Sequence, residues 1–304
     1  MDEAPRTKLI NRTHALGVGA NAGLAALKLS VGGIAGSRAL VADGIHSLSD
    51  VVMNAAAWFG WRWASRPRDA DHHYGHGNGE ALTTLIVGVI VISAGIGLVW
   101  SALSGTSTVQ ADLLGALAIA VEALTVAVKI GLARITGRRG RDLHSPILVA
   151  VSRDNRADVL TSTLVMIAIA GAISGLTALE PIAAAAIGAL IIRDGLRSVR
   201  EGLDVLMDRS PDPTLRQRIA EVAAAVDGVA CVDDLRVHPL GTHLRVDMEI
   251  AIDGHLEIRD GHAIAHAVER AVTSAVPEIT EVAVHVNPAP TPGSDDDAAL
   301  PAAR

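Results

Sequence analysis

The sequence contains few of the residues on which disulfides and nucleic-acid surfaces depend. Its 304 residues include one cysteine, one tyrosine, one phenylalanine and four tryptophans. Because a disulfide needs two cysteines, the single Cys231 excludes an internal disulfide and a cysteine-rich zinc module. Aromatic residues make up 2% of the chain and the formal net charge is −7, which indicates neither a base-stacking surface nor a basic stripe. We therefore expect no nucleic-acid partner.

Charge is also scarce, and it is unevenly distributed. Charged residues make up 19% of the chain, compared with about 25% in a typical soluble domain. Long apolar segments dominate up to about residue 207, and the sequence after Asp208 is typical of soluble protein. This pattern predicts an α-helical membrane domain over residues 1–208 and a soluble C-terminal domain over 209–288. The Pro-rich, acidic residues 289–304 are predicted to form a disordered tail.

A membrane-spanning helix needs about 20 predominantly apolar residues. Gly and Ala, which let helices approach closely in a bilayer, are abundant throughout the apolar part of the chain. The N-terminus lacks the pattern of a signal peptide, so the first span is expected to remain in the mature protein. Six transmembrane helices are predicted, over residues 9–31, 39–64, 80–103, 111–136, 147–174 and 181–206.

Lysine and arginine are concentrated in alternate connections. They cluster before the first span, after the second and fourth, and around the end of the sixth. By contrast, residues 104–110 carry no charge and residues 174–180 carry only Glu180, while Arg38 is an exception to the alternation. Short Lys/Arg-rich loops stay in the cytoplasm. We therefore expect a multi-pass protein of the plasma membrane with both termini and the soluble domain in the cytoplasm.

Ionisable residues occur at helical spacing inside two of the apolar segments. The stretch VADGIHSLSDVV (41–52) places His46 and Asp50 four residues apart, and SRDNRADVLTS (152–162) does the same for Asp154 and Asp158. Residues four apart lie on one face of a helix. Together the four side chains offer one imidazole and three carboxylates, which is enough for a four-coordinate divalent cation. The sequence therefore predicts an intramembrane metal site.

A structural role is the alternative interpretation of these residues. Buried polar groups can satisfy one another, and Arg153 and Arg156 could partly neutralise the second pair. An Asp at the bilayer centre costs about 2.5–3.5 kcal/mol, however, so four such groups at matching spacing favour a functional site. Asp43, one turn before His46, could orient that imidazole or cap a local bend near Gly44.

These motifs carry a resemblance to a known family. HxxxD in the second span, DxxxD in the fifth, six spans and a soluble C-terminal domain resemble the cation diffusion facilitator family. The strings SRALVADGIHSLSDVV (37–52) and DADHHYGHGNGE (69–80) are similar to that family's span-2 signature and to the loop that follows it. The resemblance implies a homodimeric antiporter, not an enzyme, that moves a divalent cation out of the cytosol against protons. The chemistry agrees, because carboxylates and neutral imidazole bind metal while their protonated forms do not.

The resemblance also implies a second metal site, in the loop after the second span. Asp69, His72 and His76 match the residues that form this site in related transporters. The alternative is a solvated polar loop without metal affinity. Relatives often have a lysine at the position of Asn78, paired with an acid that matches Asp208, and that interdomain ion pair cannot form here.

Residues 213–287 have the pattern helix, strand, strand, helix, strand. This αββαβ order resembles the ferredoxin-like cytoplasmic domain of the family, in which two copies meet in a homodimer and bind metal between protomers. Carboxylates stand at two positions where some zinc-binding relatives have histidine, which indicates either no binuclear site or a harder, oxygen-preferring ion. The matching positions are Asp233, Asp247, His262 and His285, with Asn287 where an aspartate can occur.

The other ligand-type residues of this part are assigned simpler roles. His238, His243, His255 and His266 are predicted to be surface histidines. His266 shares a helix face with His262 and is therefore a reserve ligand. A metal-scavenging role is possible for the tail residues Asp295, Asp296 and Asp297.

Two further function classes compete with metal export. A non-transporting membrane metal sensor or scaffold would not need the complete pairs in the second and fifth spans. An intramembrane metalloprotease would need a general base and an open ligand position, and no HExxH motif occurs. Three oxygen ligands with one imidazole can hold Zn²⁺ but also suit Fe²⁺ and Mn²⁺. The expected substrate is therefore Zn²⁺, Fe²⁺ or Mn²⁺ without strict zinc selectivity.

Overall fold

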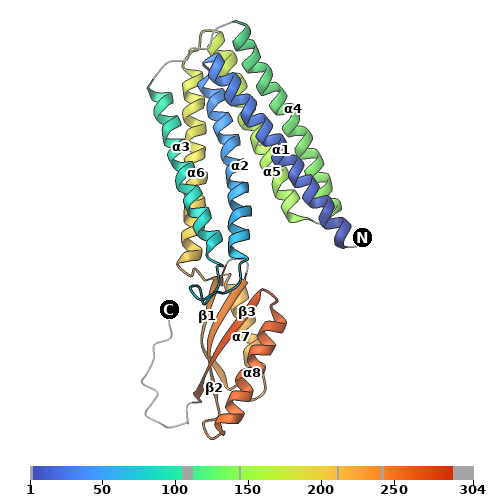
Figure 1. Ribbon diagram of the computed structural model, residues 1–304, viewed down its shortest axis with the longest axis vertical. Helices are drawn as coiled ribbons and strands as arrows, with labels where there is room; N and C mark the ends of the chain where they lie inside the picture. Colours follow the sequence, from blue (N-terminus) through green and yellow to red (C-terminus); the bar gives the residue numbers. More distant parts are fainter. Residues whose placement is uncertain (1–2, 105–111, 144, 211, 241–242, 290–304) are drawn as a thin grey trace. The chain divides into compact units, whose positions relative to one another are not determined.

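The computed structural model describes residues 3–104, 112–143, 145–210, 212–240 and 243–289 (Figure 1). The tail residues 290–304, with Asp295, Asp296 and Asp297, lie outside this range. The chain forms two compact units. One contains residues 1–59 and 83–200, and the other contains residues 60–82 and 201–304.

Six long helices make up the N-terminal part of the chain. Within the described residues, four of them are long and apolar enough to cross a membrane: Ala15–Ala35 of α1, all of α3 and α4, and Leu148–Ile173 of α5. The prediction of six spans is thus supported for four helices. The other two, α2 and α6, carry charged side chains along their length. The helices are α1 Glu3–Ala35, α2 Arg38–Ala64, α3 Gly79–Leu103, α4 Leu113–Asp142, α5 Pro146–Ile173 and α6 Leu179–Leu206.

Local sequence signals set the ends of these helices. Asp112 caps α4, because its Oδ1 accepts hydrogen bonds from the backbone N–H groups of Leu114 (3.0 Å) and Gly115 (2.9 Å). Pro146 begins α5, where its missing N–H is not needed. The tight turn between α1 and α2 places Gly36 at φ 67°, a conformation that favours glycine.

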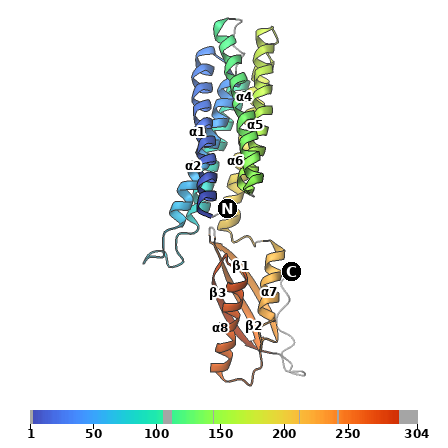
Figure 2. The same ribbon diagram turned by 90° about the vertical axis from the view of Figure 1, so that its right-hand side faces the viewer.

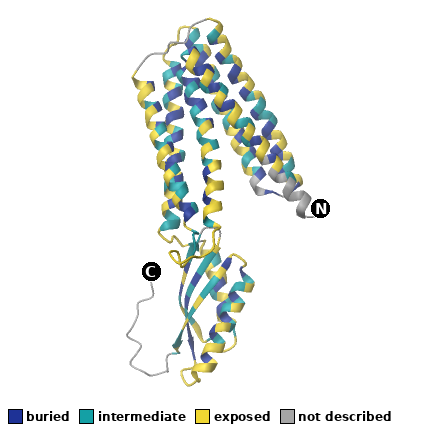
Figure 3. Ribbon diagram, viewed as in Figure 1, coloured by how far each residue is buried: buried dark blue, intermediate teal, exposed yellow. Residues whose placement is uncertain are grey.

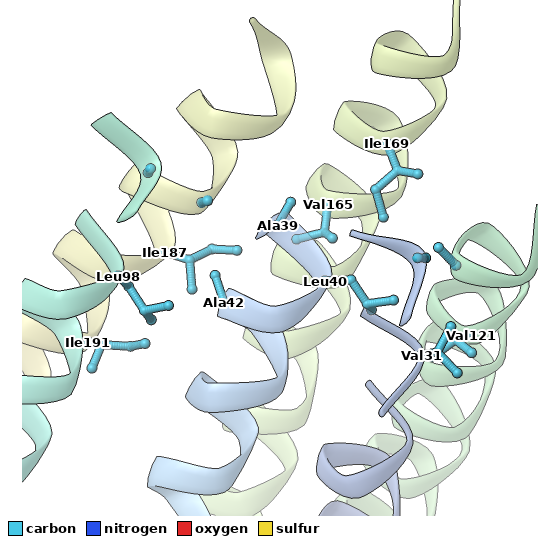
Figure 4. Close-up of a cluster of buried hydrophobic side chains, with 14 of the residues drawn as sticks. Val31, Ala39, Leu40, Ala42, Leu98, Val121, Val165, Ile169, Ile187 and Ile191 are labelled. Atoms are coloured by element: carbon cyan, nitrogen blue, oxygen red, sulfur yellow. The ribbon is translucent and has the colours of Figure 1, made fainter. Parts of the chain in front are cut away.

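A cluster of small and branched apolar side chains joins all six helices (Figure 4). Many large apolar side chains are exposed instead, including Ile90, Leu164 and Trp100, which is 74% exposed. The exposed residues of the helices are yellow in Figure 3. An exposed apolar surface of this kind suits contact with lipid rather than water. The fully or nearly buried members of the cluster include Val31, Leu40, Leu98, Val121, Val165, Ile169, Ile187 and Ile191.

Glycines hold α3 and α6 close together. A Cβ atom on Gly95 would lie 2.9 Å from the carbonyl oxygen of Gly188, and a Cβ on Gly188 would lie 3.1 Å from the carbonyl oxygen of Gly95. Gly88 and Gly195 are related in the same way, at 3.0 and 2.9 Å. Two reciprocal glycine pairs therefore allow backbone contact between these helices, as small residues do in membrane proteins.

The C-terminal part has the predicted αββαβ order: α7 Pro213–Ala224, β1 Cys231–Leu240, β2 His243–Ile252, α8 Ile258–Ala275 and β3 Ile279–Pro288. The sheet order is β1-β2-β3, with β1 antiparallel and β3 parallel to β2. Alternate residues of β2, such as Val246 and Ile250, are fully buried against Ile219 of α7 and Val268 of α8. Figure 2 shows α7 and α8 beside the sheet. The two helices therefore cover one face of the sheet and leave the alternate, polar residues on the other face.

Candidate metal site

The structure brings together three of the four predicted intramembrane ligands. One ligand atom each from His46 and Asp50 of α2 and Asp158 of α5 lie within 4.8 Å of one another. Nε2 of His46 is 3.9 Å from Oδ1 of Asp158, and these side chains are 16% and 18% exposed. The spacing of four residues on α2 places His46 and Asp50 on the side that meets α5. This half-buried group can coordinate a cation or take up protons.

The group opens into a cavity of about 580 Å³ lined by α1, α2, α5 and α6. Asp154 lines this cavity too, but it is exposed and lies outside the group of three. Asp194 and two arginines of α6 add further charge to the cavity wall. An ion held by the three central ligands is therefore accessible to solvent and to Asp154.

A buried lysine that the sequence analysis missed completes this site. Nζ of Lys129, on α4, lies 2.5 Å from Oδ2 of Asp158, and the lysine side chain is 1% exposed. The alternative interpretation assigned the neutralising role to Arg153 and Arg156, but both are exposed, and the cation next to Asp158 is Lys129. The signal was present in the sequence as a single lysine within the apolar run ALTVAVKIGLA (123–133).

Asp43 has a different partner from those that were predicted. Its Oδ2 is 2.5 Å from Nζ of Lys28 on α1 and accepts a hydrogen bond of 2.9 Å from Oγ of Ser162 on α5. Gly44 serves close packing, because a Cβ there would lie 2.9 Å from the side chain of Leu29. Asp43 is thus part of a buried ion pair one helical turn before His46 and contacts α1 and α5.

The loop residues also form a compact group. Ligand atoms of Asp69, His72 and His76 lie within 4.8 Å of one another. Oδ1 of Asp69 is 3.1 Å from Nδ1 of His72, and Oδ2 is 3.4 Å from Nε2 of His76. The backbone N–H groups of His72 and Asp71 donate to Asp69, and the bond from His72 is the main cause of a lowered pKa of this carboxyl. Nδ1 of His76 is buried without a hydrogen-bond partner.

The loop packs on the sheet of its own unit. Arg68 forms an ion pair of 2.5 Å with Glu281 of β3, and the Arg245 guanidinium lies 4.9 Å from the centre of the Tyr74 ring. A Cβ on Gly77 would lie 2.8 Å from the backbone of Leu240. These contacts, rather than solvation alone, determine the shape of the loop.

Asp208 contacts a histidine. The lysine that would pair with this acid is replaced by Asn78. Nδ1 of His238 is 3.3 Å from Asp208, and Nε2 of the same ring is 3.3 Å from Asp247. His238 was predicted to be a surface histidine, but it is half-buried between two carboxylates. His243, His255 and His266 are exposed, as predicted.

The four ligands predicted for the C-terminal part do not form a group within a single chain, among the residues that the structure describes. Neither of the two metal-ligand groups found among the described residues includes Asp233, Asp247, His262 or His285. His262 instead has Nε2 at 3.1 Å from Nε2 of His266. A site shared between protomers would need a second chain, so this assignment stays a prediction. The other predicted positions have polar neighbours. Asn287 donates hydrogen bonds to Asp233 and Glu249. Arg245 contacts Asp247, and His285 is opposite Glu249 in the β2–β3 register.

Comparison with known proteins covers nearly the whole chain. Residues 15–207 match the family model of the cation efflux transmembrane domain, and residues 211–289 match that of the cation efflux protein cytoplasmic domain. The chain is 31% identical over 302 residues to Metal tolerance protein 2 of Oryza sativa subsp. japonica, covering 90% of this chain and 77% of that protein. It is 29% identical over 294 residues to the manganese efflux system protein MneP of Bacillus subtilis (strain 168), covering 93% and 97%. The solved structure MamM-CTD 215-293 is 31% identical with a TM-score of 0.24, covering 25% of this chain and 95% of that one.

Proposed function

The chain belongs to the cation diffusion facilitator family of cation efflux proteins, and we propose that it is a proton-coupled antiporter that exports divalent transition-metal cations from the cytosol. Members of this family are transporters and not enzymes. The observation that carries the proposal is the group of His46, Asp50 and Asp158 between two helices of the membrane domain. These ligands bind either a metal or protons, so alternate exposure of one site to both sides of the membrane exchanges the two.

The proposed topology has six spans, including α2 and α6, with both termini in the cytoplasm of a plasma-membrane protein. Two of the ionisable residues of α2, His46 and Asp50, are proposed ligands, which is expected where intramembrane charge serves transport. We propose domain boundaries at 1–208, 209–288 and 289–304, with homodimerisation through the cytoplasmic domain. Metal bound by the loop group, and by Asp233, Asp247, His262 and His285 between protomers, would regulate that dimer.

The proposed substrates are Mn²⁺, Fe²⁺ and Zn²⁺. Asp50 and Asp158 supply oxygen, Asp154 is close enough to the cavity to add a third carboxylate, and His46 supplies the only imidazole of the group. A set dominated by oxygen suits Mn²⁺ and Fe²⁺ at least as well as Zn²⁺. The name of the Bacillus relative, a manganese efflux system protein, supports the inclusion of Mn²⁺ among the substrates.

Reconstitution tests this proposal. The purified chain in sealed liposomes should carry Mn²⁺, Fe²⁺, Zn²⁺, Co²⁺ or Cd²⁺ inward, followed with an entrapped metal indicator. Asp158→Ala should abolish this flux in protein that remains folded and dimeric, while Arg153→Ala, exposed on the same helix, should retain it. Flux in Asp158→Ala at the wild-type rate would refute the site. No flux for any ion from wild-type protein that still binds metal would favour the sensor function.

A further inference from the structure

A second buried polar cluster lies one helical turn from the proposed metal site. It contains the Lys28–Asp43 ion pair, with Lys28 1% and Asp43 3% exposed at the side chain. Ser162 donates to Asp43, and Lys28 also lies 3.3 Å from Ser162 and 3.4 Å from Ser47. The fifth member is Glu122 of α4, which is fully buried.

Glu122 is the member of this cluster that no cation balances. Its carboxyl group interacts with Asp43, Lys28 and Ser162, but neither oxygen accepts a hydrogen bond from a described donor. The single positive charge of Lys28 is already engaged by Asp43 at 2.5 Å. An ionised Glu122 would be a second buried carboxylate beside Asp43 with one lysine, Lys28, to balance both, and this is too costly to persist, so Glu122 holds a proton in this conformation. As an acid it can donate to Asp43.

Three helices connect this cluster to the metal site through polar residues on shared faces. On α4, Glu122, Thr125 and Lys129 are all buried at spacings of three and four. On α5, Ser162 follows Asp158 by four residues, and on α2 the buried residues Asp43 and Ser47 precede Asp50. Lys129 therefore links the metal site to the buried polar cluster, because it pairs with Asp158 and shares a helix face with Glu122.

We propose that Glu122 is a proton-binding site of the exchange cycle, separate from the metal ligands. A divalent cation that binds Asp158 displaces Lys129 from that carboxylate and leaves an unpaired positive charge on the face of α4 that also carries Glu122, two turns away. Glu122 then releases its proton and becomes the counter-charge. When the metal leaves, Lys129 returns to Asp158 and Glu122 takes up a proton again. The groups that face Glu122 are Lys28 of α1, Asp43 of α2 and Ser162 of α5. Lys129 is buried on the same face of α4, two turns from Glu122.

The inference rests on the proposed metal–proton exchange, and proton release on metal binding tests it separately from transport. Purified full-length protein is titrated with Mn²⁺ or Cd²⁺ in weakly buffered solution containing a pH indicator. Glu122→Gln, which resembles the neutral acid in shape, should bind the ion with an unchanged Kd and release about one proton fewer per ion than the wild type. The matched control is Glu180→Gln, which removes another fully buried glutamate, at the start of α6, and should release as many protons as the wild type.

The outcomes distinguish the inference from the function on which it rests. Equal proton release by Glu122→Gln and the wild type, at equal metal binding, would overturn the role of Glu122 and leave the antiporter intact. A wild type that binds metal and releases no proton would overturn proton coupling itself. If Glu122→Gln does not fold, infrared difference spectra of the wild type with ¹³C-labelled glutamate replace it. Loss of a protonated glutamate carbonyl band on metal addition is expected, and its absence would contradict the proposal.

Discussion

Nζ of Lys129 lies 2.5 Å from Oδ2 of Asp158, while Oδ1 of the same carboxylate lies 3.9 Å from Nε2 of His46. One carboxylate thus contacts a lysine ammonium group through one oxygen and lies near a candidate metal ligand, His46, with the other. A metal that binds Asp158 must compete with the ammonium group. We therefore expect Lys129 to limit the affinity of the site and to help the ion leave.

Lys129→Met should increase metal affinity, because it removes the ammonium group that lies 2.5 Å from Oδ2 of Asp158. We expect the Kd for Mn²⁺ or Cd²⁺ at pH 8 to fall by about tenfold or more, with slower turnover in liposomes. Lys129→Arg keeps the charge and should bind metal like the wild type. An unchanged or weaker affinity in Lys129→Met, in folded protein, would show that the lysine does not compete with the ion.

His46→Asp should shift the metal preference. The change replaces the only imidazole of the central group with a carboxylate, which makes the ligand set harder. The ratio of Mn²⁺ to Zn²⁺ transport should rise by about tenfold, measured by competition in the same liposomes. The same selectivity series in mutant and wild type would refute the role given to His46.

Gly95→Ala should destabilise the helical unit. The new Cβ would lie 2.7 Å from Cγ1 of Ile192 and 2.9 Å from the carbonyl oxygen of Gly188, so α3 and α6 must separate. Overpacking of this kind costs about 1–3 kcal/mol. Gly97→Ala is the matched control on the same helix, because nothing lies within 4 Å of its Cβ. Thermal unfolding in detergent should show a lower Tm for Gly95→Ala only, and equal values for the two variants would contradict the close approach.

Asp69 should remain ionised at every pH at which the loop binds metal. Hydrogen bonds from the His72 and Asp71 backbone lower its pKa below the ordinary 3.8. A lowered pKa means that the ionised carboxylate stabilises the loop above pH 3.8 and that this contribution is lost only as the pH falls through the lower, folded value. The protons displaced by metal between pH 5 and 8 must therefore come from other groups.

Asp69→Asn keeps the acceptor oxygen but removes a charged ligand. In an Asp158→Ala background, Co²⁺ binding to the loop should weaken by about tenfold or more, with the same number of protons displaced per ion between pH 5 and 8. Asp69→Ala, which also loses the acceptor, should bind more weakly still. Fewer displaced protons in Asp69→Asn would mean that Asp69 itself titrates in this range.

The sequence predicts which ionisable residues share a helix face, but it does not predict their partners on other helices. The spacing of His46 and Asp50 predicts that they share one face of α2, and both lie close to Asp158 of α5. The same spacing on α5 did not bring Asp154 into this group. The pairing of Lys129 with Asp158, and of Lys28 with Asp43, depends on how helices rotate and cross. Sequence spacing within one helix carries no such information, and for this reason Arg153 and Arg156 were assigned a role that a lysine on α4 fulfils.

The loop illustrates the same limit over a longer distance. Asp69, His72 and His76, the set that the family resemblance implies, form a compact group. The contact of Arg68 with Glu281 joins residues 213 positions apart, so no local pattern predicts that the loop packs on the sheet. His238 was misassigned for a related reason, since Asp208 and Asp247 reach it only through the fold.

Uphill accumulation tests the central claim most directly. Liposomes that contain the wild-type protein are prepared with an acidic interior and placed in a less acidic solution containing Mn²⁺, and the free ion on both sides is measured. If protons and metal exchange at Asp50 and Asp158, internal Mn²⁺ should rise above the external concentration, collapse with a protonophore, and not rise at all in Asp50→Ala. Accumulation that persists in Asp50→Ala, or wild-type flux indifferent to the pH gradient, would contradict the account.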